Sequence, residues 1–292
     1  MEDWDFEPFS PEGLKKRLEQ LNAPHLKRGL RLIDKGKLDE AYEELMKVFN
    51  ADQDNGFALQ YLASVFLRKG KPTFANRILK DAFWLNGGYF PPFLYLLRAE
   101  VNRDLGNIEQ WRVNAMKAAL YEETEYHARI ELADCYYTQG LYELAIDQID
   151  MALELRDKSS SSFLLLQKGI CMLKIKRYQE AEDCSQKVIA IQPSFQEAYS
   201  LRAEALFYRG RIEEAVEAQM EALACKFKQK EEEDSERCII ARKLLCKKAF
   251  GLYQKHLLAM IKKRKHKAEW QAELEEACQI ANKKNTRSAK RD

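Results

Sequence analysis

The feature that most constrains this chain is a set of residue columns that recur together at intervals of 34 or 36 residues. One column contains only small residues, at Gly29, Ala63, Ala99, Ala133, Gly169 and Ala203. Seven positions further on lies a column of glycines with one lysine, at Gly36, Gly70, Gly106, Gly140, Lys176 and Gly210. Columns that stay in phase through six successive units of sequence predict a solenoid, in which one structural unit is repeated.

Two further columns follow five and twelve positions after the glycine column, and they are also mostly small. They are Ala41, Ala75, Trp111, Ala145, Ala181 and Ala215, and then Val48, Ala82, Ala118, Ala152, Val188 and Ala222. Small residues allow two antiparallel helices to cross closely, and a glycine after the first helix supplies the left-handed conformation of a tight turn. Each repeat is therefore predicted to be a helix–turn–helix. Trp111 interrupts one small column, so repeat three should be splayed or locally repacked.

These residues resemble the tetratricopeptide repeat. The pattern is clearest in repeat four, which has Leu132, Ala133, Tyr136, Gly140, Ala145 and Ala152. Repeat five adds Gly169, Tyr178, Ala181 and the closing Pro193, a proline that the other five repeats lack, and repeat six has Tyr199, Ala203, Gly210, Ala215 and Ala222. The resemblance covers about residues 24–225. It implies an all-α, right-handed superhelical solenoid of about six helix–turn–helix repeats with capping helices, in a family of general protein-binding scaffolds.

The repeats divide the chain into three predicted parts: residues 1–23, 24–225 and 226–292. The first part begins with an acidic lead that contains Trp4, Phe6 and Phe9. Ser10-Pro11 then favours a helix start. We expect a capping helix behind a loose lead, and the alternative is that the aromatic lead is a docking motif for another protein.

The third part differs in charge, with 19 Lys and Arg against 10 Asp and Glu. Residues 237–268 include eleven Lys or Arg and no acidic residue, and their apolar positions recur at helical spacing. We predict one long basic amphipathic helix here, followed by another helix near residues 268–282 and by a disordered tail over the last ten residues. The basic surface comprises Lys262, Lys263, Arg264, Lys265 and Lys267. It is consistent with contact to an acidic protein or nucleic acid, with a nuclear import signal, or with a solvated cap.

No phosphate-binding glycine loop, nucleophile elbow or zinc-protease motif occurs in the sequence. We therefore expect a protein that is not an enzyme and that needs no cofactor or metal. The seven cysteines show no CxxC pair, which favours reduced thiols and a cytoplasmic location, with nuclear and cytoskeletal or ciliary locations left open. No apolar run is long enough to predict a membrane span.

In the tetratricopeptide family the first helices of the repeats line a concave groove that binds partner proteins. The matching positions here are mainly apolar or aromatic: Phe57, Phe93, Leu96, His127, Ile130, Tyr137, Phe163, Leu166, Leu173 and Phe207. They lack the basic residues with which chaperone-binding members clamp a carboxylate, so we predict an apolar or amphipathic partner segment. Packing within the helix layer, or coverage by the chain's own ends, is the alternative. A structural role in a larger assembly, such as a ciliary or microtubule-associated one, remains open.

Overall fold

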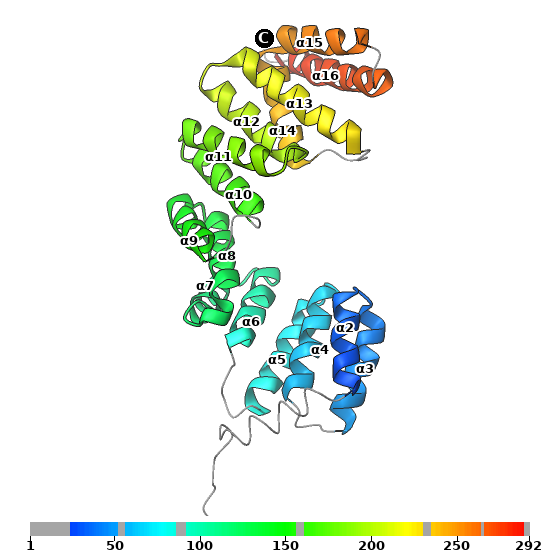
Figure 1. The fold of residues 1–292 in the computed structure, drawn as a ribbon, viewed down its shortest axis with the longest axis vertical. Helices are drawn as coiled ribbons and strands as arrows, with labels where there is room; N and C mark the ends of the chain where they lie inside the picture. Colours follow the sequence, from blue (N-terminus) through cyan, green and yellow to red (C-terminus); the bar gives the residue numbers. More distant parts are fainter. Residues whose placement is uncertain are drawn as a thin grey trace, which may run out of the picture. The chain divides into compact units, whose positions relative to one another are not determined.

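The computed structural model describes residues 24–51, 56–85, 92–155, 161–229, 235–263 and 266–288 (Figure 1). These residues form fifteen α-helices, and no strand occurs among them. The predicted lead and capping helix of residues 1–23 lie outside the described residues. Within the described part of the chain, no helix combines the length and the apolar character that a membrane crossing requires.

Twelve helices form six consecutive pairs, and each pair is joined by a three-residue turn. The pairs are α2 (Pro24–Asp34) and α3 (Leu38–Ala51), α4 (Gly56–Arg68) and α5 (Pro72–Leu85), α6 (Pro92–Asp104) and α7 (Ile108–Ala118), α8 (Glu122–Thr138) and α9 (Tyr142–Glu154), α10 (Ser161–Lys174) and α11 (Tyr178–Ile191), and α12 (Gln196–Tyr208) and α13 (Ile212–Gln229). This arrangement confirms the predicted all-α helix–turn–helix repeats.

The six turns share one hydrogen-bond pattern, in which the residue after the turn glycine donates its N–H to a carbonyl five residues earlier. In repeat four, Leu141 N donates to Tyr136 O at 2.9 Å, and in repeat five Arg177 N donates to Met172 O at 2.9 Å. The turn residue has a positive φ in every repeat, including 75° at Gly140 and 66° at Lys176. This is the Schellman motif, for which glycine is best suited because it has no Cβ.

Residue contacts divide the chain into two compact bodies, an N-terminal body (Met1–Cys135) and a C-terminal body (Tyr136–Asp292). The three small columns are buried in both bodies: Ala41, Ala75, Ala145, Ala181 and Ala215 have no exposed surface. A Cβ atom added at Gly169 would lie 2.7 Å from Leu201 Cδ2 and 3.1 Å from Cys184 Cβ, so a side chain here would force its neighbours to shift. The predicted boundaries after residues 23 and 225 stay predictions.

Trp111 takes the place of a small residue in α7, and repeat three is repacked around it. The indole is only 4% exposed. Its Nε1 donates a 2.8 Å hydrogen bond to Glu131 Oε2 on α8, which satisfies the one polar atom of the ring. The larger side chain is thus accommodated by burying an acid beside it.

The C-terminal body ends in three more helices, α14 (Glu236–Lys248), α15 (Phe250–Lys262) and α16 (Lys267–Ser288). The prediction of one long basic helix is therefore wrong, because the helical conformation is interrupted at Ala249, whose φ and ψ are −139° and 32°. Helix α16 also continues to Ser288, past the start of the predicted disordered tail. The break lets both segments bury their apolar positions in one cluster, which includes Leu245 on α14, Tyr253 on α15 and Trp270 on α16. A single straight helix over both segments could not bring the apolar residues of α14 and of α15 into the same cluster.

Candidate partner-binding surface

In the N-terminal body the predicted groove residues of α6 leave an aromatic ring partly open. The Phe93 side chain is 37% exposed, and its ring stacks on Tyr61 of α4 with centroids 6.1 Å apart and planes at 30°. Leu96, one helical turn further along α6, is half-buried. The sequence prediction therefore identified a ring that is supported from one side and open to solvent on the other.

The next first helix, α8, presents His127 and Ile130. His127 is exposed and makes an edge contact with the neighbouring Tyr126, with ring centroids 5.1 Å apart, and Ile130 is half-buried. The side chain of Phe57 lies outside the described residues. Gln60, in the same column as Leu96 and Ile130, is buried, and neither polar atom of its amide has a hydrogen-bond partner among the described residues.

Charged residues mark the end of this surface that lies nearest the turns. Arg103 Nη1 of α6 donates to Glu131 Oε1 of α8 at 2.6 Å. Burial raises the pKa of Glu131 to about 7, against the opposing effect of the Arg103 charge, and the nearby Glu100 raises it further. Burial also raises the pKa of Glu100, which lies two helical turns after Phe93 on α6. The surface thus passes from apolar residues to desolvated carboxyl groups.

In the C-terminal body the predicted residues divide into exposed and covered ones. Phe163 on α10 is 55% exposed, whereas Leu166 and Leu173 on the same helix are buried at 5% and 9%. Tyr137 and Phe207 are half-buried. The two buried leucines have little area left for a partner, so Phe163 is the one large exposed apolar side chain among the described groove residues predicted in this body.

Helix α14 covers the turn-proximal part of α12. Arg237 Nη1 on α14 donates to both carboxylate oxygens of Glu204 on α12, at 3.0 and 3.2 Å. Burial raises the pKa of Glu204, and the Arg237 charge opposes that rise. Phe207 packs against the apolar cluster of the C-terminal helices. A segment of the chain itself therefore occupies the inner surface of repeat six.

The predicted basic surface lies around the junction of α15 and α16. Lys262, Lys263 and Lys267 are exposed, and Arg264 and Lys265 lie outside the described residues. Two other basic residues of the acid-free stretch, Arg237 and Arg242, form ion pairs with acids of the same chain. The structure adds no support for contact with an acidic protein or nucleic acid.

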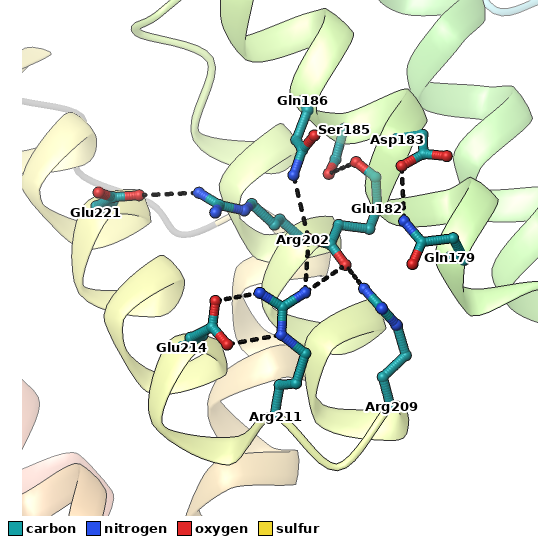
Figure 2. A network of polar contacts seen from close by, with 10 residues as sticks. All are labelled: Gln179, Glu182, Asp183, Ser185, Gln186, Arg202, Arg209, Arg211, Glu214 and Glu221. Atoms are coloured by element: carbon teal, nitrogen blue, oxygen red, sulfur yellow. Dashed lines mark hydrogen bonds and ion pairs between the residues drawn. The ribbon is translucent and has the colours of Figure 1, made fainter.

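Sequence reasoning missed a buried carboxylate that joins repeats five and six (Figure 2). The side chain of Glu182 on α11 is 3% exposed and lies between Arg209 and Arg211, which flank the turn glycine of repeat six. Arg211 Nη1 donates to both Glu182 oxygens at 3.2 and 3.3 Å, and Gln186 Nε2 donates to Oε1 at 3.1 Å. The paired arginines around Gly210 were the only sequence signal for this contact.

Comparisons with known proteins agree with this architecture. A family model described as anaphase-promoting complex, cyclosome, subunit 3 matches residues 114–188. No curated protein matches the sequence. The C-terminal part of a TPR repeat-containing protein from Cytophaga hutchinsonii is 14% identical, with a TM-score of 0.63 over 81% of this chain and 94% of that one.

Two further solved structures are similar. The pilF protein of Pseudomonas aeruginosa is 15% identical, with a TM-score of 0.62 over 77% of this chain and 97% of that one. A chain of the APC/C hetero-tetramer Cut9–Hcn1 is 17% identical, with a TM-score of 0.59 over 77% of this chain. This chain spans only 44% of that chain's length. The described helices therefore have the tetratricopeptide-repeat fold.

Proposed function

We propose that this chain is a non-catalytic adaptor that binds an apolar or amphipathic segment of another protein along the inner surface of its N-terminal body. The observation that carries the proposal is the Phe93 ring, which is held in place by Tyr61 and yet 37% exposed. An aromatic ring fixed by a neighbour loses little conformational freedom when a partner covers its open side. Leu96 on the same helix and Ile130 on α8 are half-buried, so both retain apolar surface for a partner.

The charged end of the surface indicates what else the partner should carry. Glu100 lies on the same face of α6 as Phe93, and burial raises its pKa. A lysine or arginine next to the partner's apolar residues would stabilise the ionised form of this carboxyl group. The favoured ligand is therefore an amphipathic helix or extended segment with apolar anchors and one basic residue.

The buried acids of the described helices support a scaffold without catalysis. Glu131, Glu182 and Glu273 each accept hydrogen bonds from an arginine of the same chain, which ties their carboxylates into the fold. Carboxyl groups held in this way are committed to contacts within the fold.

The test uses a photoreactive benzophenone amino acid in place of Phe93 in the full chain. We expect it to crosslink to one segment of a partner protein, and Ile130→Asp should abolish that crosslink. The matched control is the same substitution at Phe74, which is also exposed at 57% but lies on α5, a second helix. Equal crosslinking from positions 93 and 74, or no effect of Ile130→Asp with helical content unchanged, would contradict the proposal.

A second candidate is a structural role within a larger assembly. Two observations favour it: the family model of an anaphase-promoting complex subunit over residues 114–188, and the similarity to a chain of the APC/C hetero-tetramer. In this case the chain should migrate in cell extract with a mass far above that of its 34.1 kDa monomer. Migration as a monomer during size-exclusion chromatography at physiological salt would exclude a stable assembly.

A further inference from the structure

The outer face of α2 carries a hollow lined by basic residues. Its volume is about 490 Å³, and the described residues that line it are Pro24, Lys27, Arg28, Arg31, Leu32 and Lys35. Arg28 lies near Glu44 and helps to lower the pKa of that carboxyl. Among the described residues, no ion pair is found for Lys27, Arg31 or Lys35. The hollow is thus a concentration of positive charge around a small apolar floor.

The repeat register shows which positions of the later first helices match this face of α2. Val65 and Leu62 of α4 occupy the positions of Arg31 and Arg28, 34 residues later, and both pack in the core cluster of the first repeat. The position of Arg31 is also buried and uncharged in each later repeat: Val101, Cys135, Cys171 and Ala205. In α2 the face that would otherwise receive a preceding repeat is therefore charged, and it is unsuited to an apolar helix.

The segment that precedes α2 has the complementary chemistry. Residues 1–14 contain five acidic residues and no basic one, and Trp4, Phe6 and Phe9 alternate with the acids. Carboxylates can pair with Lys27, Arg31 and Lys35, and aromatic rings can cover Leu32 and the aliphatic stems of the basic residues or stack on a guanidinium group. We propose that the acidic aromatic lead, residues 1–9, docks within its own chain into the basic hollow of α2.

The covalent connection makes the intramolecular contact the favoured one. Fourteen residues separate the lead from Pro24, and at 1.5 Å per residue even a continuous helix of that length would reach ~21 Å. The eleven residues of α2 extend over ~16 Å, so the lead can reach Lys35 at the far end. Tethering also gives the lead a high effective concentration, which a second copy of the chain matches only in concentrated solution. Docking would close the terminal face of the repeat array to further stacking.

The test is zero-length carbodiimide coupling in the dilute full-length protein, which joins a carboxylate to a lysine amine only when the two are in contact. We expect coupling between residues 2–7 and Lys27 or Lys35, with a yield that falls as salt is added. In Arg31→Glu/Lys35→Glu, coupling to the remaining Lys27 should fall several-fold. In the matched control Arg77→Glu/Lys80→Glu, which changes two exposed residues of α5, it should stay unchanged.

Charge exchange distinguishes docking from a nonspecific loss of structure. Asp5→Lys/Glu7→Lys changes no residue of a described helix. By itself it should lower the coupling to Lys27 several-fold. Combined with Arg31→Glu/Lys35→Glu, it should restore coupling between the two segments. The proposal is overturned if wild type shows no coupling at low salt, if the hollow variant and the α5 control behave alike, or if charge exchange fails to restore coupling. A mixture of isotopically light and heavy protein identifies the occupant. If coupled products join a light chain to a heavy chain as often as they join chains of one kind, a second copy occupies the hollow, and the proposal is also overturned.

Discussion

Arg242 Nε on α14 donates a 2.6 Å hydrogen bond to Glu273 Oε1 on α16, and both side chains are almost completely buried. The same carboxylate oxygen accepts a hydrogen bond from Tyr253 Oη of α15 at 2.6 Å. A second acid of α16, Glu276, lies 2.7 Å from Arg242 Nη1. One buried carboxylate therefore joins the three C-terminal helices, and the chain can fold a strongly basic stretch inward because α16 supplies the acids.

We predict that removing Glu273 destabilises the C-terminal body severely. Glu273→Ala leaves Arg242 buried without its main partner, which should lower the free energy of unfolding by roughly 3–5 kcal/mol. Tyr253→Phe removes a single hydrogen bond and should lower it by only about 1 kcal/mol. Urea unfolding monitored by circular dichroism measures both, with Glu275→Ala, an exposed change on the same helix, as the control. Equal stability of Glu273→Ala and Glu275→Ala would contradict the assigned role.

The turn of repeat five should be improved by glycine. Lys176 has a φ of 66°, a left-handed conformation that a residue with a Cβ adopts at a cost of roughly 1–2 kcal/mol. Lys176→Gly should therefore stabilise the protein by roughly 0.5–1 kcal/mol, after the greater freedom of glycine in the unfolded chain is subtracted. The converse change, Gly140→Ala at the same position of repeat four, should destabilise. A higher urea midpoint for Gly140→Ala than for wild type would show that this turn gains nothing from glycine.

The small residues at the helix crossings should not tolerate larger ones. Ala145 and Ala181 have no exposed surface, so a leucine at either position would force the two helices apart. We expect Ala145→Leu and Ala181→Leu each to destabilise by roughly 1–3 kcal/mol. Glu143→Leu, an exposed change on α9, should have almost no effect. Thermal melting compares the three variants, and melting temperatures for Ala145→Leu and Ala181→Leu equal to that of wild type would show that the crossing can expand.

The N-terminal body should lose stability as the pH rises through the titration of Glu131. Its folded pKa, about 7, exceeds the unfolded value of 4.5, so the fold favours the protonated acid. Below pH 4.5 this acid is protonated in both the folded and the unfolded state, so its titration does not change the free energy of unfolding there. From there the stability should decrease with rising pH until Glu131 is ionised above pH 7, by up to about 3 kcal/mol.

Glu131→Gln isolates this effect, because the amide oxygen can still accept hydrogen bonds from Trp111 and Arg103. Between pH 5 and pH 7.5, wild type should lose stability relative to Glu131→Gln in urea unfolding. A constant difference between the two proteins across this interval would show that burial leaves the acid ionised in the fold.

The local patterns of the sequence were sufficient for the repeat architecture. The columns of small residues fix where the helices cross, since positions such as Ala181 and Gly169 have no space for a large side chain. The turn glycines, together with Lys176, fix where the helices end, since a positive φ is needed there. These are constraints between residues close in sequence or repeated at a constant interval, so they can be read from the chain directly. They also placed Phe93 and Phe163 at exposed positions on first helices.

Interactions across long sequence distances were decided by the tertiary structure alone. The pattern of the basic stretch from Arg237 to Ala268 predicted one long amphipathic helix, but Arg237 pairs with Glu204 and Arg242 with Glu273, 33 and 31 residues away. Glu182 likewise meets Arg209 and Arg211 only because consecutive repeats stack. The sequence determined the repeat and its turns because these depend on local geometry. Which charges would be buried depended on the acids that packing brought to them, and no local pattern contains that information.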